Sequence, residues 1–572
     1  MADKIEQYKA ADAPLPSSYL SWDLFGAGIE HLGRAGKPVR LPLRPPRDDE
    51  VLLRVDAIGL CFSDTKLIWA GPEHPRIRGR DLESDPTVPG HEPSLTVVAV
   101  GRDWRERFRV GERYLVQADV YVNGEQKAYG YVQRGALAQY TYAGPWLLDG
   151  DEGCYLLPLQ PSTGYAQAAL VEPYTCVEAA YRIPQRTHTA AGGRMLVVAA
   201  PGAQPADLAG VFPQGGPSLI AALGDAKVHN APADLAPVLD GGANPDAVAR
   251  AKDRHTDGQG FDDILLLGAP DENLARACDE ALAAGGVLCL LGEPPEAPVD
   301  VGRVHYHATR HVGARGGPVA EAYCANTRQD LAPGGAAWMV GAAGPMGQMH
   351  VQRALEAGDP PAKLLCTDLS DERNAALAAR YAQAAGERGV ELVIRNPAEA
   401  GDFDAEVRAF APQGFDDIVI MAPAASVVEQ SAAHLAPGAM LNVFAGVKPG
   451  TLARLPLSLF ADKHVRCVGS SGSRLEDIRE TLRKTEADEM NTNFSLAALG
   501  DVYQAWQGMQ CVKQGTYPGK IVLFPHLADL GLQPLADLAR SCPAAHAALG
   551  PGGSWTVDAE RALFADRLPD QA

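Results

Sequence analysis

Residues 336–358 read AAWMVGAAGPMGQMHVQRALEAG, which is the pattern of a buried strand, a glycine-rich turn and a helix. Backbone N–H groups at the start of such a helix can hold a pyrophosphate, and glycine lets the phosphate approach closely. The best fit to the glycine fingerprint places Ala342, Gly344 and Gly347 on its three positions, directly after Gly341. The stretch therefore predicts a parallel α/β domain that binds a dinucleotide. A glycine turn in a domain that binds nothing is the alternative.

The next stretch, KLLCTDLSDER (363–373), begins with a strand pattern that ends at Asp368. Asp368 lies about 20 residues beyond Gly347. A carboxylate there accepts hydrogen bonds from the ribose hydroxyls and repels a 2′-phosphate, which favours NAD. Arg373 lies close by in sequence and could tolerate a phosphate, so NADP stays open. The predicted cofactor site comprises Gly341, Ala342, Gly344, Pro345, Met346, Gly347, Asp368, Arg373, Ala422 and Gly446.

Apolar strands alternate with helical stretches from about residue 190 to 480, and this region contains a repeat. GFDDILLLG (260–268) resembles GFDDIVIMA (414–422), and HVGARG (311–316) resembles CVGSSG (467–472). The matched blocks keep their order, which favours two tandem copies of one domain over chance resemblance. The first copy has lost the glycine spacing, and Pro205 stands where its helix should open. We expect that copy to bind no dinucleotide.

Composition limits the class of protein. The chain has 572 residues, enough for about three or four domains, and a formal net charge of -20. An acidic surface argues against non-specific binding of nucleic acid or anionic membranes. The N-terminus lacks the apolar core of a signal peptide, and no apolar run reaches about 18 residues, so we expect a cytoplasmic protein. The ten cysteines form no CxxC pair, which is typical of free thiols with an occasional metal ligand.

Residues 1 to about 185 have a mostly β pattern and contain a set of metal-competent side chains. Cys61 lies in GLCFSDTK (59–66), His91 and Glu92 in TVPGHE (87–92), and Glu172 in VEPYTC (171–176). One thiolate, one imidazole and one or two carboxylates are a plausible zinc set with an open position for substrate. Each residue alone is ordinary: a buried cysteine, a surface histidine, a helix-start glutamate. Only the set, placed before a dinucleotide domain, is informative.

That set resembles the zinc-dependent medium-chain alcohol and polyol dehydrogenases, and most closely their sorbitol dehydrogenase and sorbose-phosphate reductase branch. The family motif GxCxSD matches Cys61, GHE matches residues 90–92, EP matches residues 172–173, and GxGPxG matches residues 342–347. The resemblance implies that Cys61 and His91 bind one catalytic zinc. It further implies that Glu172 binds the zinc directly or through water and that Glu92 is an exchangeable ligand.

The same resemblance assigns the proton chemistry, and together with the repeat it sets the fold that we expect. Ser63 would relay the alcohol proton, and Asp64 would orient His91. The fold expected is α/β, with a GroES-like β domain and two tandem Rossmann-type, doubly wound parallel-sheet domains. The predicted order is a zinc domain (1–185), a degenerate Rossmann-like domain (186–329), an NAD-binding Rossmann domain (330–482), a return to the catalytic domain (483–526) and a helical tail (527–572).

Three features depart from the family. Many relatives carry a four-cysteine structural zinc lobe, but no cysteine occurs between Cys61 and Cys154, so a second zinc is not expected. The first fingerprint glycine is replaced by Ala342. The extra α/β copy and the tail beyond about 527 lie outside the resemblance.

The predicted activity is hydride transfer between NAD and a secondary alcohol or ketone of a polyol, sugar or sugar phosphate. Arg76, Arg78 and Arg80 suit phosphate recognition, and a solvated basic loop or an interface loop is the alternative. Two rival functions remain: a non-catalytic binding or assembly protein derived from a dehydrogenase, and a zinc-free quinone reductase-like enzyme. We also expect the two α/β copies to pack as an intramolecular pseudo-dimer through their sheet edges, with or without homo-oligomerisation.

Overall fold

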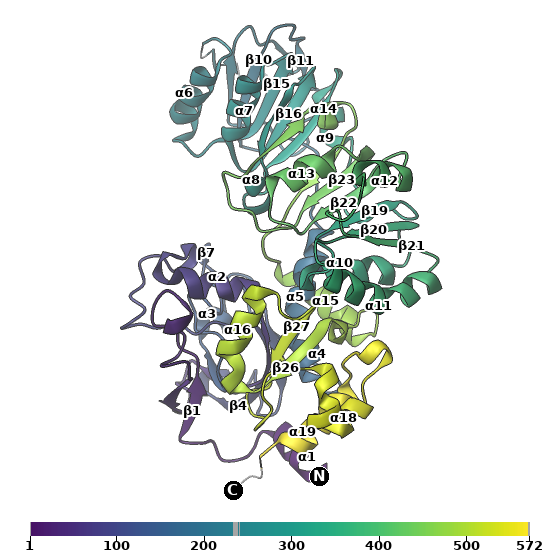
Figure 1. Cartoon of the computed structure of the whole chain (residues 1–572). Helices are drawn as coiled ribbons and strands as arrows, with labels where there is room; N and C mark the ends of the chain where they lie inside the picture. Colours follow the sequence, from purple (N-terminus) through teal and green to yellow (C-terminus); the bar gives the residue numbers. More distant parts are fainter. Residues whose placement is uncertain (1, 233–237, 240, 570–572) are drawn as a thin grey trace. The chain divides into compact units, whose positions relative to one another are not determined.

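The computed structural model describes residues 2–232, 238–239 and 241–569, and the chain folds into two compact units (Figure 1). The first unit is built from the chain up to Glu178, from Gly344–Met349 and from Gly472 onward. The second unit contains Ala179–Ala343 and His350–Ser471. Within the described ranges, no helix is both long and apolar enough to cross a bilayer.

An antiparallel sheet forms the centre of the first unit, with the order β28-β26-β27-β3-β4-β5-β9 and with β8 also paired to β3. Only the β26–β27 pair is parallel. Every residue of β3 is buried, as expected for a central strand covered on both faces. The strands of this unit are β1 (Ser18–Ser21), β2 (Val39–Pro42), β3 (Val51–Leu60), β4 (Glu92–Val100), β5 (Arg113–Val116), β6 (Tyr121–Val122), β7 (Glu125–Gln126), β8 (Tyr140–Ala143), β9 (Leu156–Pro158), β26 (Leu496–Gly500), β27 (Lys520–Leu523) and β28 (Gln533–Pro534).

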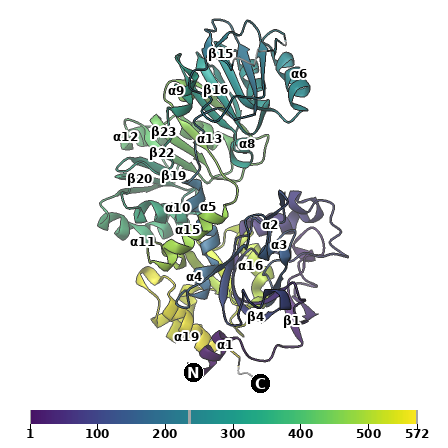
Figure 2. The same cartoon turned by 180° about the vertical axis from the view of Figure 1, so that it is seen from behind.

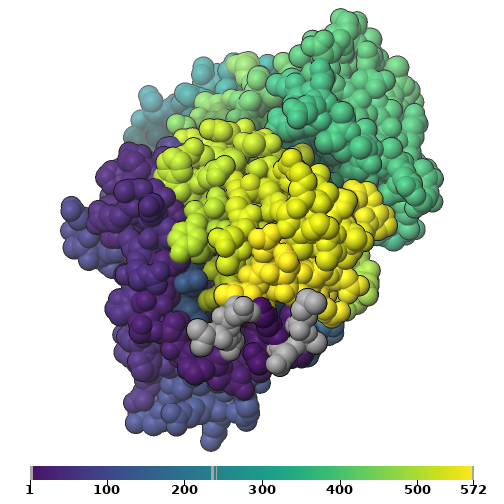
Figure 3. Space-filling model, turned by 60° about the horizontal axis from the view of Figure 1, so that its bottom comes forward, coloured from purple at the N-terminus to yellow at the C-terminus, as the bar shows by residue number. Residues whose placement is uncertain are grey.

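The C-terminal part of the chain returns to this sheet and then covers it. Strand β27 pairs with β3 in the register Ile521↔Leu60, which brings Lys520 to the end of β3. Beyond it, the last helices pack an aromatic cluster that includes Trp555 and Phe564. In the space-filling view the yellow C-terminal segment lies against purple N-terminal residues (Figure 3), and Ile5 and Tyr8 belong to the same cluster. The helices wholly or mostly in this unit are α1 (Ala2–Ala10), α2 (Phe62–Ala70), α3 (Pro145–Leu148), α4 (Tyr165–Ala169), α5 (Val171–Ala180), α15 (Leu475–Glu486), α16 (Ala505–Gln514), α17 (Leu538–Ser541), α18 (Pro543–Ala547) and α19 (Val557–Arg567).

Two six-stranded parallel sheets make up the second unit, with the orders β14-β12-β10-β15-β16-β18 and β21-β20-β19-β22-β23-β25. Corresponding strands stand at corresponding places, so the repeat in the sequence corresponds to a repeat of topology. The strands are β10 (Arg194–Ala199), β11 (Ala206–Asp207), β12 (Leu219–Leu223), β13 (Val228–His229), β14 (Val238–Leu239), β15 (Phe261–Gly268), β16 (Leu282–Gly292), β17 (Glu296–Asp300), β18 (Arg310–Ala314), β19 (Ala336–Val340), β20 (Lys363–Thr367), β21 (Glu391–Arg395), β22 (Phe415–Ile420), β23 (Leu435–Val443), β24 (Leu452–Pro456) and β25 (Arg466–Val468).

Helices cover both faces of these sheets. In the second sheet, α11 lies on one side and α12 and α13 on the other (Figures 1 and 2). In the first sheet, Leu196 and Val198 pack with residues of α6 and α7, whereas Met195 and Val197 pack with residues of α9. The helices are α6 (Pro245–Thr256), α7 (Glu272–Glu280), α8 (Val301–Tyr306), α9 (Val319–Cys324), α10 (Pro345–Glu356), α11 (Asp371–Glu387), α12 (Phe403–Phe410), α13 (Ala425–Ala432) and α14 (Ser458–Ala461).

The two halves of the second unit meet through contacts that repeat with their roles exchanged. Strand β17 pairs antiparallel with β24, and the central pair of this ladder is Pro298↔Arg454, whose numbers differ by 156. Val301 N donates to Thr451 O, and Leu457 N donates to Pro295 O, each over 3.0 Å. The residue numbers of the two donors differ by 156, and so do those of the two acceptors. The exchange of roles is the signature of an approximate two-fold axis.

The edge strands β18 and β25 lie next to each other, but no ladder joins them in the part of the chain that the structure describes. The halves are therefore linked by the β17–β24 ladder, and the predicted continuation of one sheet into the other through edge strands is not what forms. The main-chain hydrogen bonds between the halves come instead from β17 and β24. These two strands follow β16 and β23, which are equivalent strands of the two sheets.

The turn after β10 differs from the turn after β19. Residues 200–218 form turns and the short strand β11, and no helix follows β10 directly. After β19, α10 begins at Pro345, five residues beyond the end of the strand. The first half thus lacks the helix start that holds a pyrophosphate in a dinucleotide domain.

Candidate functional site

Three metal-competent side chains converge in the first unit. Cys61, His91 and Glu92 each present one ligand atom, and these atoms lie within 4.8 Å of one another. Cys61 is the residue before α2, and Glu92 is the first residue of β4. Gly90 has a φ of +94°, a left-handed conformation that turns the chain just before His91. The Pro-Gly turn thus delivers two adjacent side chains beside the start of α2.

A buried carboxylate, Asp64, organises these ligands. Its Oδ1 accepts hydrogen bonds from His91 Nδ1 over 3.0 Å and from Gly90 N over 3.1 Å, and its Oδ2 accepts one from Cys61 N over 3.2 Å. Because the Nδ1 proton is held by Asp64, Nε2 is the nitrogen left for a metal. Burial lowers the pKa of His91, but the Asp64 carboxylate outweighs burial and raises it well above its ordinary value. A metal that binds there must displace a proton.

Ser63 lies close to both Cys61 and His91. Its Oγ donates to Cys61 Sγ over 3.1 Å and lies 3.3 Å from His91 Nε2. The hydroxyl is therefore within reach of any group bound beside this thiol and imidazole.

Glu92 is paired with a residue more than 400 positions away. Lys520 Nζ donates to Glu92 Oε1 over 2.6 Å, and both side chains are almost fully buried. The other carboxylate oxygen, Oε2, is buried and has no hydrogen-bond partner in the described chain. Gly59 faces Glu92 in the β3–β4 register, and a Cβ on Gly59 would lie too close to Oε2.

This donor set fits a zinc ion. Thiolate, imidazole and carboxylate are the groups that bind Zn²⁺ in proteins, and one buried carboxylate oxygen still lacks a partner. A cation at this place would satisfy that oxygen.

Glu172 lies outside the group of three that converges. It is a half-buried residue at the start of α5, and burial raises its pKa to about 7 against the opposing charge of His91. Cys176, one helical turn further on, donates its thiol to Glu172 Oε1 over 3.8 Å. Sequence reasoning missed Cys176, although a spacing of four on a helix places two side chains on the same face.

The arginine loop before His91 is largely used within the fold. Arg76 forms an ion pair with Asp119 over 3.0 Å, and Arg80 forms one with Asp85 over 2.9 Å. Arg78 is exposed. Two of the three arginines therefore form ion pairs within the local structure.

The glycine-rich turn after β19 has the expected backbone. Gly341 has a φ of +82°, and the N–H groups of Gly341 and Ala342 both donate to Thr367 O, over 2.7 and 3.0 Å. A Cβ on Gly341 would lie 3.3 Å from Ala422 N, so the ends of β19 and β22 approach closely. Residues 344–347 lead into or begin α10, and Gly446 lies beyond the end of β23. These positions follow the carboxyl ends of parallel strands, where such sheets bind nucleotides.

Asp368 follows β20 directly and lies at the same end of the sheet. Its Oδ1 accepts from Ser370 N and from Arg373 Nη2, each over 3.1 Å. Its side chain is only 8% exposed. The charge of Arg373 is thus already balanced by Asp368, which fits NAD better than a 2′-phosphate.

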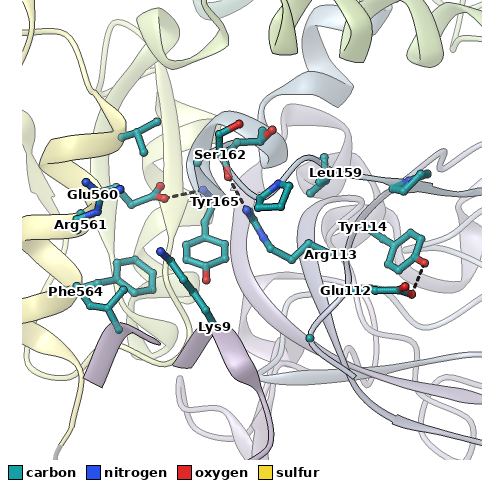
Figure 4. A pocket seen from close by; sticks show the side chains of 17 residues that line it. Lys9, Glu112, Arg113, Tyr114, Leu159, Ser162, Tyr165, Glu560, Arg561 and Phe564 are labelled. Atoms are coloured by element: carbon teal, nitrogen blue, oxygen red, sulfur yellow. Dashed lines mark hydrogen bonds between the residues drawn. The ribbon is translucent and has the colours of Figure 1, made fainter. Parts of the chain in front are cut away.

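A separate cavity of about 450 Å³ lies among α1, β5 and α19 in the first unit and contains none of the predicted site residues (Figure 4). Beside it, Glu560 of α19 accepts hydrogen bonds from the N–H groups of Tyr165 and Ala166, over 2.6 and 2.8 Å. The C-terminal helix thereby caps α4, the helix just before α5 and Glu172.

Comparisons with known proteins agree with this geometry. Residues 47–148 match the family described as Alcohol dehydrogenase GroES-like domain, and residues 345–487 match Zinc-binding dehydrogenase. L-sorbose 1-phosphate reductase of Klebsiella pneumoniae is 28% identical over 47% of this chain and 70% of its own. Mannitol-1-phosphate 5-dehydrogenase of Aliivibrio fischeri is 27% identical over 86% of this chain and 84% of its own. The solved structure of 2R,3R-butanediol dehydrogenase from Bacillus subtilis covers 89% of this chain and 100% of its own, with 14% identity and a TM-score of 0.49.

The first matched domain contains the converging ligands, and the second begins at Pro345, where the glycine-rich turn leads into α10. These matches and relatives support a zinc-type medium-chain alcohol or polyol dehydrogenase, an oxidoreductase that acts on CH–OH groups.

Proposed function

We propose that this protein is a zinc-dependent dehydrogenase that moves a hydride between NAD and a secondary alcohol or ketone of a polyol, sugar or sugar phosphate. The observation that carries the proposal is the convergence of Cys61, His91 and Glu92, together with a Glu92 oxygen that has no partner in the described chain. The names of the relatives, a reductase of sorbose 1-phosphate and a dehydrogenase of mannitol 1-phosphate, support the substrate class.

Each side chain has a distinct task in this proposal. Cys61 and His91 would hold the zinc, with Glu92 as an exchangeable ligand. Glu172 would bind the zinc directly or through water. Zinc would supply a Lewis acid that makes an alcohol hydroxyl a stronger acid. Asp64 keeps the His91 ring in one orientation through the bond to Nδ1.

Oxidation of an alcohol releases one proton and one hydride. Ser63 can accept the proton at Oγ and pass its own toward solvent, because its hydroxyl lies beside both Cys61 and His91. The nicotinamide of NAD supplies the acceptor for the hydride. Gly341 leaves room for the cofactor's phosphates at the turn, and Asp368 would accept hydrogen bonds from its ribose.

We further propose that the first α/β half acts as a built-in partner for the second half and binds no NAD. The exchanged contacts around Pro298 and Arg454, and the absence of a helix directly after β10 in the described residues, support this interpretation. Titration calorimetry should then show one NAD per chain, and two would contradict the proposal.

The decisive experiment combines a metal assay with a substrate screen. Chelator-washed and zinc-reloaded protein should contain about one zinc per chain and reduce NAD with at least one polyol, sugar or sugar phosphate. Cys61→Ser should lose both properties, because a hydroxyl is a much poorer zinc ligand than a thiolate. Cys154→Ser, at a half-buried cysteine of the same unit, should keep both. Wild-type protein that retains no zinc and reduces no NAD would favour a non-catalytic role.

A further inference from the structure

Two buried arginines meet where the halves of the second unit contact each other. Arg310 is the first residue of β18, and Arg466 is the first residue of β25. They differ by 156 in number, the same offset as the exchanged contacts of the β17–β24 ladder. Their exposed fractions are 8% and 3%. The approximate two-fold axis thus brings two equivalent positive charges together out of water.

Only neutral acceptors contact these guanidinium groups. Arg310 Nη1 donates to Thr309 O over 2.9 Å and to Val304 O over 3.4 Å. Arg466 donates from its two terminal nitrogens to the carbonyl oxygens of Arg328 and Ile183. Among the described residues neither arginine forms an ion pair.

The positive charges are costly at this place. Burial lowers the pKa of Arg310 to about 10. The pKa of Arg466 is lowered to about 10 mainly by burial and also by the charges of Arg310 and Arg328. Buried charges in proteins are normally paired, because an unpaired ion loses its hydration without compensation.

Donors at this place also lack acceptors. Arg466 Nε is buried and has no hydrogen-bond partner in the described chain. Arg310 makes both of its described bonds through Nη1, which leaves Nη2 and Nε for another acceptor. The nearby carboxylate of Asp279 is already engaged, because it accepts from His311 Nε2 and from Asp300 N.

A small cavity adjoins the two arginines. Its volume is about 10 Å³, and Arg310, His311 and Arg466 are among the residues that line it. A cavity of this size holds about one water-sized sphere, so it suits a monatomic ion better than a phosphate or a carboxylic acid. His311 Nδ1 is a further buried atom without a described partner.

We propose that this cavity binds one halide-sized monovalent anion, chloride in the cell, between Arg310 and Arg466. The anion accepts hydrogen bonds from both guanidinium groups, reduces the repulsion between them and thereby ties β18 to β25. No hydrogen-bond ladder joins the edge strands β18 and β25 in the described chain, and the anion with its two arginines forms an ionic bridge between them.

Crystals of the unmodified protein grown in sodium bromide provide a direct test, because bromide replaces chloride and has an anomalous signal. We expect an anomalous peak between the two arginines. In solution, replacing sodium gluconate by sodium chloride at equal ionic strength should raise the Tm by about 2–4 °C. Equal ionic strength separates specific binding from general screening.

Arg466→Gln should abolish the difference in Tm between chloride and gluconate. Arg454→Gln is the matched control, because Arg454 lies in the β17–β24 ladder at the same interface but is half exposed and paired with Glu272. This control should keep the chloride effect. If Arg466→Gln does not fold, the bromide peak and the Tm of the unmodified protein decide. No bromide between the arginines together with equal Tm values in the two salts would overturn the proposal and leave water as the occupant.

Discussion

Replacing Asp64 by asparagine tests whether this buried carboxylate orients a metal ligand. Asp64 accepts three hydrogen bonds, from His91 Nδ1 and Gly90 N on one oxygen and from Cys61 N on the other. An asparagine has a single acceptor oxygen. If this oxygen faces His91, the new NH₂ group confronts the N–H of Cys61. If the amide is flipped, the NH₂ group faces the N–H of Gly90 and His91 Nδ1. This orientation favours the histidine tautomer that carries its proton on Nε2.

Both orientations predict a measurable cost. Loss of one hydrogen bond to a buried charged acceptor should lower the free energy of unfolding of the metal-free protein by about 1.5–3 kcal/mol. Loss of the orienting carboxylate should weaken zinc binding by about 10–100-fold, which corresponds to about 1.4–2.7 kcal/mol. Competition with a chromophoric chelator measures the zinc affinity without any dependence on activity.

Asp56→Asn is the matched control for this experiment. Asp56 of β3 is as fully buried as Asp64 of α2, and it accepts hydrogen bonds from Arg54 and Thr96 and none from a candidate ligand. The control should lose stability and keep its zinc affinity. Equal zinc affinity in Asp64→Asn and wild type, or an equal loss in both variants, would refute the orienting role.

Three further outcomes follow from other parts of the structure. Asp368→Ala should narrow the preference for NAD over NADP, because it removes both the ribose contact and the repulsion of a 2′-phosphate; kcat/KM with each cofactor measures this, and an unchanged ratio would contradict it. Burial, aided by Arg353, lowers the pKa of His350 to about 3. Between pH 6.5 and pH 3 the unfolded state therefore binds a proton that the folded state does not, so the free energy of unfolding falls as the pH falls through this range. His350→Phe should therefore reduce the loss of unfolding free energy between pH 7 and pH 5 by about 2 kcal/mol, as measured by urea unfolding, and an unchanged pH dependence would count against the assignment. Glu560→Gln should lower stability by about 1–3 kcal/mol, because the amide cannot accept from both N–H groups at the start of α4, whereas the same change at the exposed neighbour Arg561 should have little effect.

Local patterns in the sequence were sufficient to predict the α/β class and the converging ligands. The strand, glycine turn and helix at 336–358 form as predicted because periodicity and glycine act over a few residues. Cys61, His91 and Glu92 were recognisable because each stands in a short motif, and the family comparison agrees with the motifs.

Contacts between distant segments were not predictable in the same way. The ion pair between Lys520 and Glu92 depends on β27 reaching β3 after more than 400 residues, and no local spacing encodes that register. The β17–β24 ladder was missed for a similar reason, since short strands outside the main sheets have little pattern of their own. The tail could be assigned as helical, but its contact with α4 through Glu560 depends on tertiary packing.

The ladder between Pro298 and Arg454 has an evolutionary and a physical consequence. In a symmetric homodimer, a residue on the two-fold axis faces its own copy, so an arginine there would face an arginine. On a single chain the two sides of the axis are encoded separately, and proline and arginine can stand opposite each other. The association is also intramolecular, so dilution does not separate the halves, and their pairing is independent of protein concentration.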